Sequence, residues 1–121
     1  SNTDVAQRGY AAFVAGDMPG LLALCTPDIQ WVYFGQVPWA GDFKRHEGVL
    51  QFFDILGKTL EFEAFDPLEF FEAKDAVTVL GTTKSKVRAT GARFDNNWAH
   101  VFYVRDGQIA KYVGHDTQAI T

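Results

Sequence analysis

The chain has 121 residues, of which 47% are hydrophobic and 15% aromatic, and this composition excludes a disordered chain. The formal net charge is −4 and the Lys and Arg residues do not cluster, so we expect no nucleic-acid partner. No apolar run has the length of a bilayer span and no signal peptide is recognisable, so we expect a cytoplasmic protein without a membrane partner.

The first half of the chain predicts three helices. The first begins at Thr3 or Asp4, whose side-chain oxygen is expected to cap it, and ends near Ala15. A second helix over residues 18–25 has a proline near its start, a position that proline tolerates well. A third is expected over residues 47–57, where apolar side chains recur at helical spacing.

Strands account for most of the remaining chain. The β-branched and aromatic segment IQWVYF, residues 29–34, predicts the first strand, and a loop over residues 35–41 follows it. The dipeptides Lys74-Asp75, Thr90-Gly91 and Asp106-Gly107 predict hairpin turns. The strands that these turns separate are expected at about 60–72, 76–89, 92–105 and 108–115. Helices followed by a long meander predict an α+β fold, in one domain over residues 1–121.

Three segments carry a resemblance to a known family: AFVAGDMPGLLALCTPDIQW at residues 12–31, HEGVLQFF at 46–53 and WAHVFYVRDGQI at 98–109. Their order and spacing resemble the nuclear transport factor 2-like superfamily, and within it the SnoaL-like group, which includes polyketide cyclases. The resemblance implies a cone-shaped, curved, mostly antiparallel sheet and three helices that enclose a hydrophobic pocket. It also implies a homodimer formed through the outer face of the sheet, here at Val101 and Tyr103.

Ketosteroid isomerases are more distant members of this superfamily, and their catalytic residues are mostly missing here. Their helical tyrosine aligns with Gly9, so Tyr10 is expected one position away, on another side of the helix. Their aspartate base aligns with Tyr33, and a phenol is a poor base at neutral pH. Their second oxyanion donor aligns with His100. We therefore do not expect a ketosteroid isomerase.

The SnoaL-like cyclases are a better match at one position. They carry a histidine six residues before the Asp-Gly turn, and His100 matches it. Their acid/base aspartate aligns with Gly114, and a second histidine aligns with Tyr112. His115 and Asp116 follow directly and would supply the missing carboxylate only if the strand ends differently. The resemblance thus implies four candidate catalytic residues: His100, Tyr112, His115 and Asp116.

Strand alternation predicts which side chains face the pocket. Since His100 is expected inside, Trp98 and Phe102 face inward with it. Such walls suit a planar or polycyclic hydrophobic ligand that carries one or two oxygens. The expected ligand-binding residues are Trp31, Tyr33, Trp39, Phe43, Phe53, Trp98 and Phe102.

The polar groups of this pocket predict acid/base chemistry. A neutral imidazole at His100 can accept a proton and return it, which isomerisation, cyclisation and dehydration of carbonyl compounds all require. The sequence therefore predicts a small enzyme that needs no cofactor and acts on a hydrophobic carbonyl compound. The three histidines lack the spacing of metal ligands, so no metal site is expected.

Other interpretations stay open at this point. The protein could be a non-catalytic binder in which His100 only hydrogen-bonds the ligand, or a dimerisation module. His100 could also be a buried residue that bonds a backbone carbonyl or a tyrosine. His115 and Asp116 are neighbours, so in a strand they point to opposite faces, and a solvated strand end is the alternative to a catalytic role.

Overall fold

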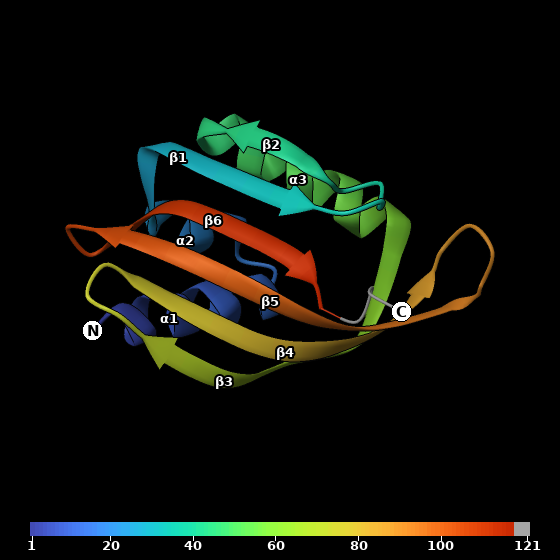
Figure 1. Ribbon diagram of the computed structural model, residues 1–121. Helices are drawn as coiled ribbons and strands as arrows, with labels where there is room; N and C mark the ends of the chain where they lie inside the picture. The colour runs from blue at the N-terminus through green and yellow to red at the C-terminus, as the bar shows by residue number, and fades with distance from the viewer. Residues whose placement is uncertain (118–121) are drawn as a thin grey trace.

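The computed structural model describes residues 1–117. Figure 1 shows the helices behind a curved sheet. The helices are α1 (Asn2–Val14), α2 (Met18–Ala23) and α3 (Arg45–Thr59). The strands are β1 (Cys25–Phe34), β2 (Gly41–Lys44), β3 (Leu60–Glu72), β4 (Ala76–Val87), β5 (Arg93–Arg105) and β6 (Gln108–Asp116). This order confirms the predicted α+β fold.

The start of α1 differs from the prediction by two or three residues. Ser1, not Thr3 or Asp4, is the N-cap, and its hydroxyl accepts a hydrogen bond from the backbone N–H of Asp4 at 3.3 Å. The Asp4 carboxylate in turn accepts from the Ser1 amino group, which completes a capping box. Thr3 lies inside the first turn, and its N–H and hydroxyl both donate to Glu72 at the end of β3.

The segment between α2 and α3 contains more strand than expected. Asp17 caps α2 through the N–H of Gly20, and the helix ends at Ala23, before residue 25. β1 therefore starts at Cys25, four residues before the expected start. The predicted loop over residues 35–41 is confirmed as far as residue 40, and the short strand β2 then begins at Gly41 and pairs antiparallel with β1. Four residues, two of them charged, show too little alternation to predict a strand.

Among the described strands, the sheet has the order β2-β1-β6-β5-β4-β3 and does not close. β1 and β6 are parallel and the other neighbouring pairs are antiparallel, as the resemblance implied. The three predicted turns all lie between strands. Asp106 and Gly107 both have positive φ, the conformation of a two-residue type I′ hairpin.

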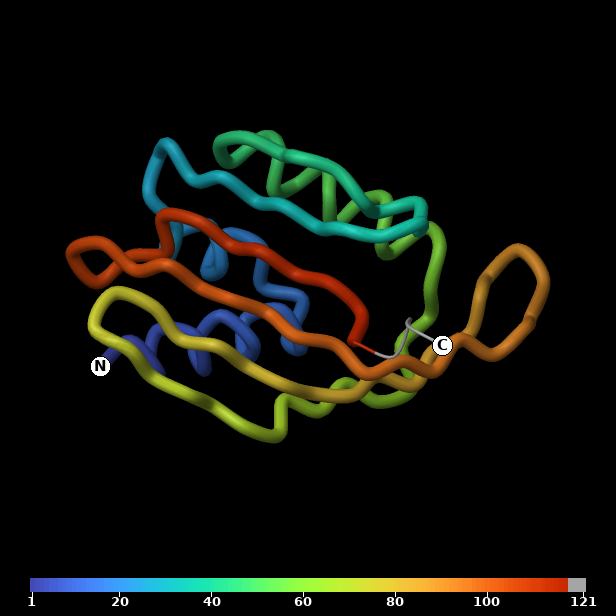
Figure 2. The backbone as a smooth tube through the Cα atoms, viewed as in Figure 1, coloured from blue at the N-terminus to red at the C-terminus, as the bar shows by residue number. Residues whose placement is uncertain are grey.

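Figure 2 shows the backbone path around the interior of the fold. α1 crosses behind β3 and β4, while α3 packs against β1 and β2 at the opposite edge of the sheet. The hairpin between β4 and β5 extends beyond the rest of the sheet. No helix in the part of the chain that is described has the length and apolarity needed to cross a membrane.

Two glycines on the sheet leave room for large aromatic side chains. Gly81 pairs with Trp98 across β4 and β5, and a Cβ at Gly81 would overlap the Trp98 ring and approach the Asp66 carbonyl oxygen to 2.6 Å. Gly114 pairs with His100, and a Cβ there would overlap the Tyr112 hydroxyl. The interior walls therefore depend on missing side chains at two positions of the sheet.

Replacement of either glycine by alanine tests this dependence. We expect Gly81→Ala and Gly114→Ala each to lower the free energy of unfolding by about 1–3 kcal/mol, the usual cost of overpacking. Gly57→Ala is the matched control, because a Cβ at this exposed position of α3 meets no atom within 4 Å. Chemical denaturation measures all three. Unchanged stability in both sheet variants would contradict the proposed packing.

Candidate functional site

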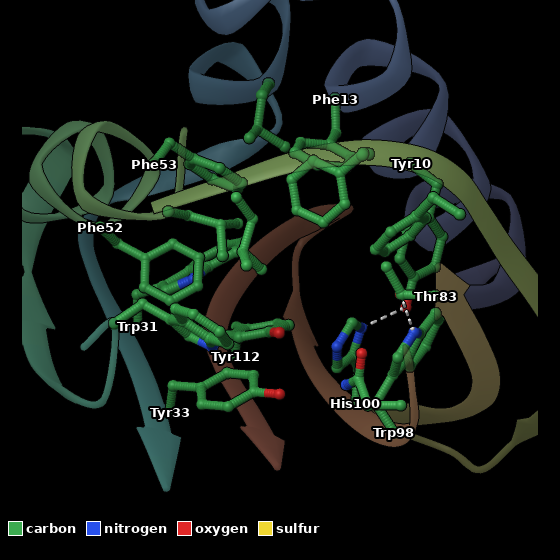
Figure 3. Close-up of a pocket in the computed structure, with 18 of the residues that line it drawn as sticks. Tyr10, Phe13, Trp31, Tyr33, Phe52, Phe53, Thr83, Trp98, His100 and Tyr112 are labelled. Carbon is green, nitrogen blue, oxygen red and sulfur yellow. Dashed lines mark hydrogen bonds between the residues drawn. The ribbon is translucent and has the colours of Figure 1, made fainter. Parts of the chain in front are cut away.

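A cavity of about 70 Å³ lies between the sheet and helices α1 and α3. Figure 3 shows aromatic rings on most sides of it and a few polar groups directed inward. The side chains that were predicted to bind a ligand and do line it are Trp31, Tyr33, Trp39, Phe53, Trp98 and Phe102. His100 and Tyr112 also line it.

A buried polar contact inside this cavity joins α1 to β5. The Tyr10 hydroxyl lies 2.8 Å from Nδ1 of His100, and both residues are buried. The Trp98 ring stacks on the imidazole, with ring centroids 3.9 Å apart and an interplanar angle of 12°. Trp98 is itself held by a 2.7 Å hydrogen bond from its indole N–H to the Thr83 hydroxyl. His100 is therefore fixed in position and orientation.

Burial shifts the pKa values of His100 and Tyr10 in opposite directions. It holds the pKa of His100 well below the usual value of 6.5, and the nearby His115 lowers it further. Burial also raises the pKa of the Tyr10 hydroxyl above its usual value of 10. Both effects follow from the cost of placing a charge in an apolar interior. At neutral pH the pair is an uncharged imidazole and an uncharged phenol.

The other three candidate catalytic residues are all on β6 but lie on different faces of this strand. Tyr112 lies on the cavity side, where its ring stacks on Trp31 at a centroid distance of 4.0 Å, and burial raises the pKa of its hydroxyl. Asp116 lies on the same face as Tyr112. His115 is exposed on the opposite face, and its Nδ1 lies 3.1 Å from the backbone oxygen of Asp116.

Asp116 anchors a second polar group at the edge of the cavity. Its Oδ1 accepts hydrogen bonds from the Tyr33 hydroxyl at 2.7 Å and from the Asn96 side-chain amide at 2.8 Å. Tyr33 and Asn96 line the cavity, whereas Asp116 lies outside the lining and bonds to these two side chains. Burial and the neighbouring Asp116 carboxylate raise the pKa of Tyr33. Asp116 therefore positions Tyr33 and Asn96.

Two of the predicted site residues lie away from the cavity. Phe43 is on the short strand β2 and packs against Phe52 of α3, with centroids 5.6 Å apart, outside the lining. The unpredicted pairing of β2 with β1 explains its position. His115 faces outward because its neighbours Gly114 and Asp116 face inward. Direct contact between His115 and a ligand in this cavity is therefore excluded.

Three polar side chains of the cavity were missed from the sequence: Tyr10, Thr83 and Asn96. Tyr10 was expected on another side of the helix, yet Gly9 and Tyr10 both face the cavity. The periodicity of the helix could have identified Tyr10, because the buried side of α1 is formed by Val5, Ala6, Gly9 and Tyr10. Asn96 lies two residues before Trp98, so strand alternation already placed it on the inward face.

Val101 and Tyr103, the residues expected at a dimer interface, lie on the outer face of β5. Val101 is half-buried and Tyr103 is exposed, with the Lys111 ammonium 5.9 Å from its ring centroid. Pairing of two copies through this face stays a prediction. Within residues 1–117, no cluster of three or more His, Cys, Asp or Glu side chains has the arrangement needed to hold a metal ion.

Comparison with known families gives a match over most of the chain. The model of the SnoaL-like domain matches residues 6–112, from the first helix of the fold to the cavity residue Tyr112. The chain belongs to the SnoaL-like domain family. No curated protein matches its sequence significantly.

Solved structures of this family superpose closely on the fold. A nuclear transport factor 2-like protein from Burkholderia xenovorans LB400 has a TM-score of 0.87 and 26% identity, over 96% of this chain and 88% of that chain. One from Burkholderia pseudomallei K96243, of unknown function, has a TM-score of 0.87 and 27% identity, over 98% and 92%. TerC, co-crystallized with polyporic acid, has a TM-score of 0.84 and 26% identity, over 96% and 91%.

The low pKa of His100 predicts a pH-dependent stability. Below about pH 6.5 the unfolded chain binds a proton at His100 that the folded chain does not bind, so the free energy of unfolding falls as the pH is lowered. We expect His100→Asn to remove this part of the dependence between about pH 7.5 and pH 5. Denaturation at a series of pH values measures it, and the exposed His115→Asn is the control. The same pH slope in wild type and His100→Asn would contradict the assignment.

Proposed function

We propose that this protein is a small acid/base enzyme that transfers protons on a hydrophobic carbonyl compound, as an isomerase, cyclase or dehydratase does, without a cofactor. One observation carries the proposal: the hydrogen-bonded pair of Tyr10 and His100 borders an aromatic cavity. Two titratable groups whose surroundings move their pKa values apart are the usual pattern of an acid and a base that work together.

The hydrogen bond between the two residues supports one division of roles. When Nδ1–H of His100 donates to the Tyr10 oxygen, Nε2 is free to accept a proton from the carbon next to the substrate carbonyl. The Tyr10 O–H is then available to donate to the carbonyl oxygen, where negative charge develops. The proton taken up at Nε2 returns to the substrate at the end of the reaction. His100 and Tyr10 end the cycle unchanged.

The rest of the cavity serves to hold the substrate. Flat aromatic faces favour an apolar body, and the excluded water strengthens each polar contact inside. The Tyr112 ring contacts His100, with ring centroids 5.0 Å apart, and Figure 3 shows Tyr33 beside Tyr112. The hydroxyls of Tyr112 and Tyr33 supply a second polar contact for a substrate with two oxygens. The similar protein TerC was co-crystallized with polyporic acid, which supports a small organic ligand here.

A non-catalytic binding protein is the second candidate, and the low pKa of His100 favours it. A base is most effective when its pKa lies near the working pH, so an imidazole far below 6.5 is a weak proton acceptor. The same imidazole still makes a good hydrogen bond to a ligand. The two candidates differ in one observable, the breaking of a carbon–hydrogen bond in the bound molecule.

Hydrogen–deuterium exchange separates the candidates. We expect the wild type to accelerate exchange of the protons next to the carbonyl of 2-octanone in D₂O, measured by NMR, because its narrow methyl ketone end suits a cavity of about 70 Å³. His100→Asn is expected to slow the catalysed exchange by about 100-fold or more, and Tyr10→Phe to slow it as well.

His115→Asn is the control for this experiment, since His115 lies on the outer face. Binding of the ketone, measured by calorimetry, is compared in every variant. Ketone binding without exchange in the wild type would contradict the enzyme and support the binding protein. Equal exchange in the wild type and His100→Asn would contradict the role of His100.

A further inference from the structure

A second hollow lies directly outside the cavity. It is a surface groove of about 480 Å³ between the end of α1, the end of α3 and β3. Six side chains line both the groove and the cavity: Phe13, Phe53, Leu56, Leu60, Phe62 and Phe65. A wall one side chain thick therefore separates the two hollows.

Phe13 is a half-buried part of this wall at the end of a helix. It lies in the last turn of α1, and its ring contacts Phe53, Phe62 and Phe65 at centroid distances of 5.4, 5.6 and 5.0 Å. Figure 3 shows this ring at the boundary of the cavity, on the helix side. Only dispersion and apolar contacts hold it, so a rotation of the ring breaks no polar interaction. Such a rotation removes the part of the wall that the Phe13 ring forms.

The size of the inner cavity makes a connection between the two hollows necessary. A cavity of about 150 Å³ is the size known to hold a benzene molecule, and ligand pockets usually measure about 300–1,000 Å³. The inner cavity has about 70 Å³, so it accepts only the end of a larger molecule. Together with the groove, the space falls within the usual range.

The charge at the edge of the groove indicates the chemistry of the ligand. Arg88 is the cationic residue among the described groove residues, and its Nε–H donates to the Gly57 carbonyl oxygen at 2.7 Å, which fixes the guanidinium. Its Nη1 lies 3.6 Å from the Glu61 carboxylate, a half-exposed pair of the kind that contributes little. The acidic groove residue Glu63 is already paired with Arg93. An incoming carboxylate therefore finds an oriented partner at Arg88.

We propose that the groove is the outer part of the ligand site and binds an elongated apolar carboxylate, of the fatty-acid type. Its carboxylate pairs with Arg88, and its apolar end passes Phe13 into the aromatic cavity. The inference rests on the proposed function, because it takes the inner cavity as the reacting end of the site. The substrate class becomes a hydrophobic carbonyl compound with a carboxylate at the end remote from His100.

The tryptophans of the chain make this orientation measurable. The sequence has three Trp residues, and all three, Trp31, Trp39 and Trp98, line the inner cavity. Bromine quenches tryptophan fluorescence at short range. We expect 12-bromododecanoate to quench strongly, since its bromine enters the cavity. The isomer 2-bromododecanoate, whose bromine stays near Arg88, is expected to quench weakly at the same occupancy. Equal quenching by both, or stronger quenching by the 2-bromo isomer, would overturn the orientation.

Two substitutions test the groove itself. We expect Arg88→Gln to weaken dodecanoate binding by up to about fivefold and to leave 1-dodecanol unaffected, as loss of an exposed ion pair predicts. Arg105→Gln is the matched control, because Arg105 is a half-exposed arginine paired with Asp28 away from the groove. Phe13→Ala is expected to tighten dodecanoate binding, and Phe13→Trp to weaken it. Unchanged dodecanoate affinity in Arg88→Gln, or tighter binding of dodecyltrimethylammonium than of dodecanoate, would overturn the carboxylate.

The outcomes also separate this inference from the proposed function. Position-dependent bromine quenching without any ketone exchange would overturn the enzyme and support the ligand orientation. Ketone exchange that depends on His100, with no quenching by either bromo acid, would support the enzyme and overturn the groove.

Discussion

The hydrogen bond between Tyr10 and His100 is the constraint on which the interior of this protein depends. It joins the first helix to the middle of the sheet across 90 residues of sequence, and both partners are buried. Loss of either partner leaves a buried polar group unsatisfied, which costs about 1–3 kcal/mol. The bond therefore fixes the rotation of α1 against the sheet, and with it the inward direction of Phe13, one turn further along the helix face. The hydrogen-bonded pair and the position of the Phe13 wall therefore depend on the same contact.

Aromatic packing explains why the cavity is small and polar at so few points. Trp98 covers Gly81, and Tyr112 and Tyr33 pack against Gly114. Each of these rings occupies space that a side chain would fill if the glycine were another residue. These rings exclude water from His100 and so lower its pKa. Gly114 thus has a packing role of its own. The carboxylate of the site lies two residues later, at Asp116, where it orients Tyr33 and Asn96.

Much of this arrangement followed from periodicity, once the family resemblance had placed His100 inside the fold. Strand alternation placed Trp98, His100 and Phe102 together, and turn dipeptides located the three hairpins correctly. Two features required the tertiary structure, and a third was misjudged from the sequence. β2 is too short to show a pattern, and its pairing with β1 moved Phe43 out of the cavity. The partner of His100 was misplaced because an alignment position was used instead of the helix phase.

The partners of Asp116 show the remaining limit of sequence analysis. Alternation along β6 puts Asp116 on the same face as Tyr112, which was inferable once the strand was known to reach residue 116. The contact between the Asp116 carboxylate and Tyr33 depends on the parallel pairing of β1 with β6, in which Tyr33 lies beside Gly114. Such pairing joins residues 81 positions apart, as Tyr33 and Gly114 are, and leaves no local signal in either strand.

The protonation state of His100 tests the account most directly. A ¹⁵N–¹H NMR correlation of the histidine rings, recorded from about pH 7.5 to about pH 5, assigns the charge and the tautomer of each imidazole. The account predicts that His100 stays uncharged below pH 6.5, with one ring nitrogen bonded to hydrogen, while the exposed His115 serves as the internal comparison. A His100 ring that titrates at its ordinary pKa near 6.5 would contradict the buried, hydrogen-bonded pair and the chemistry built on it.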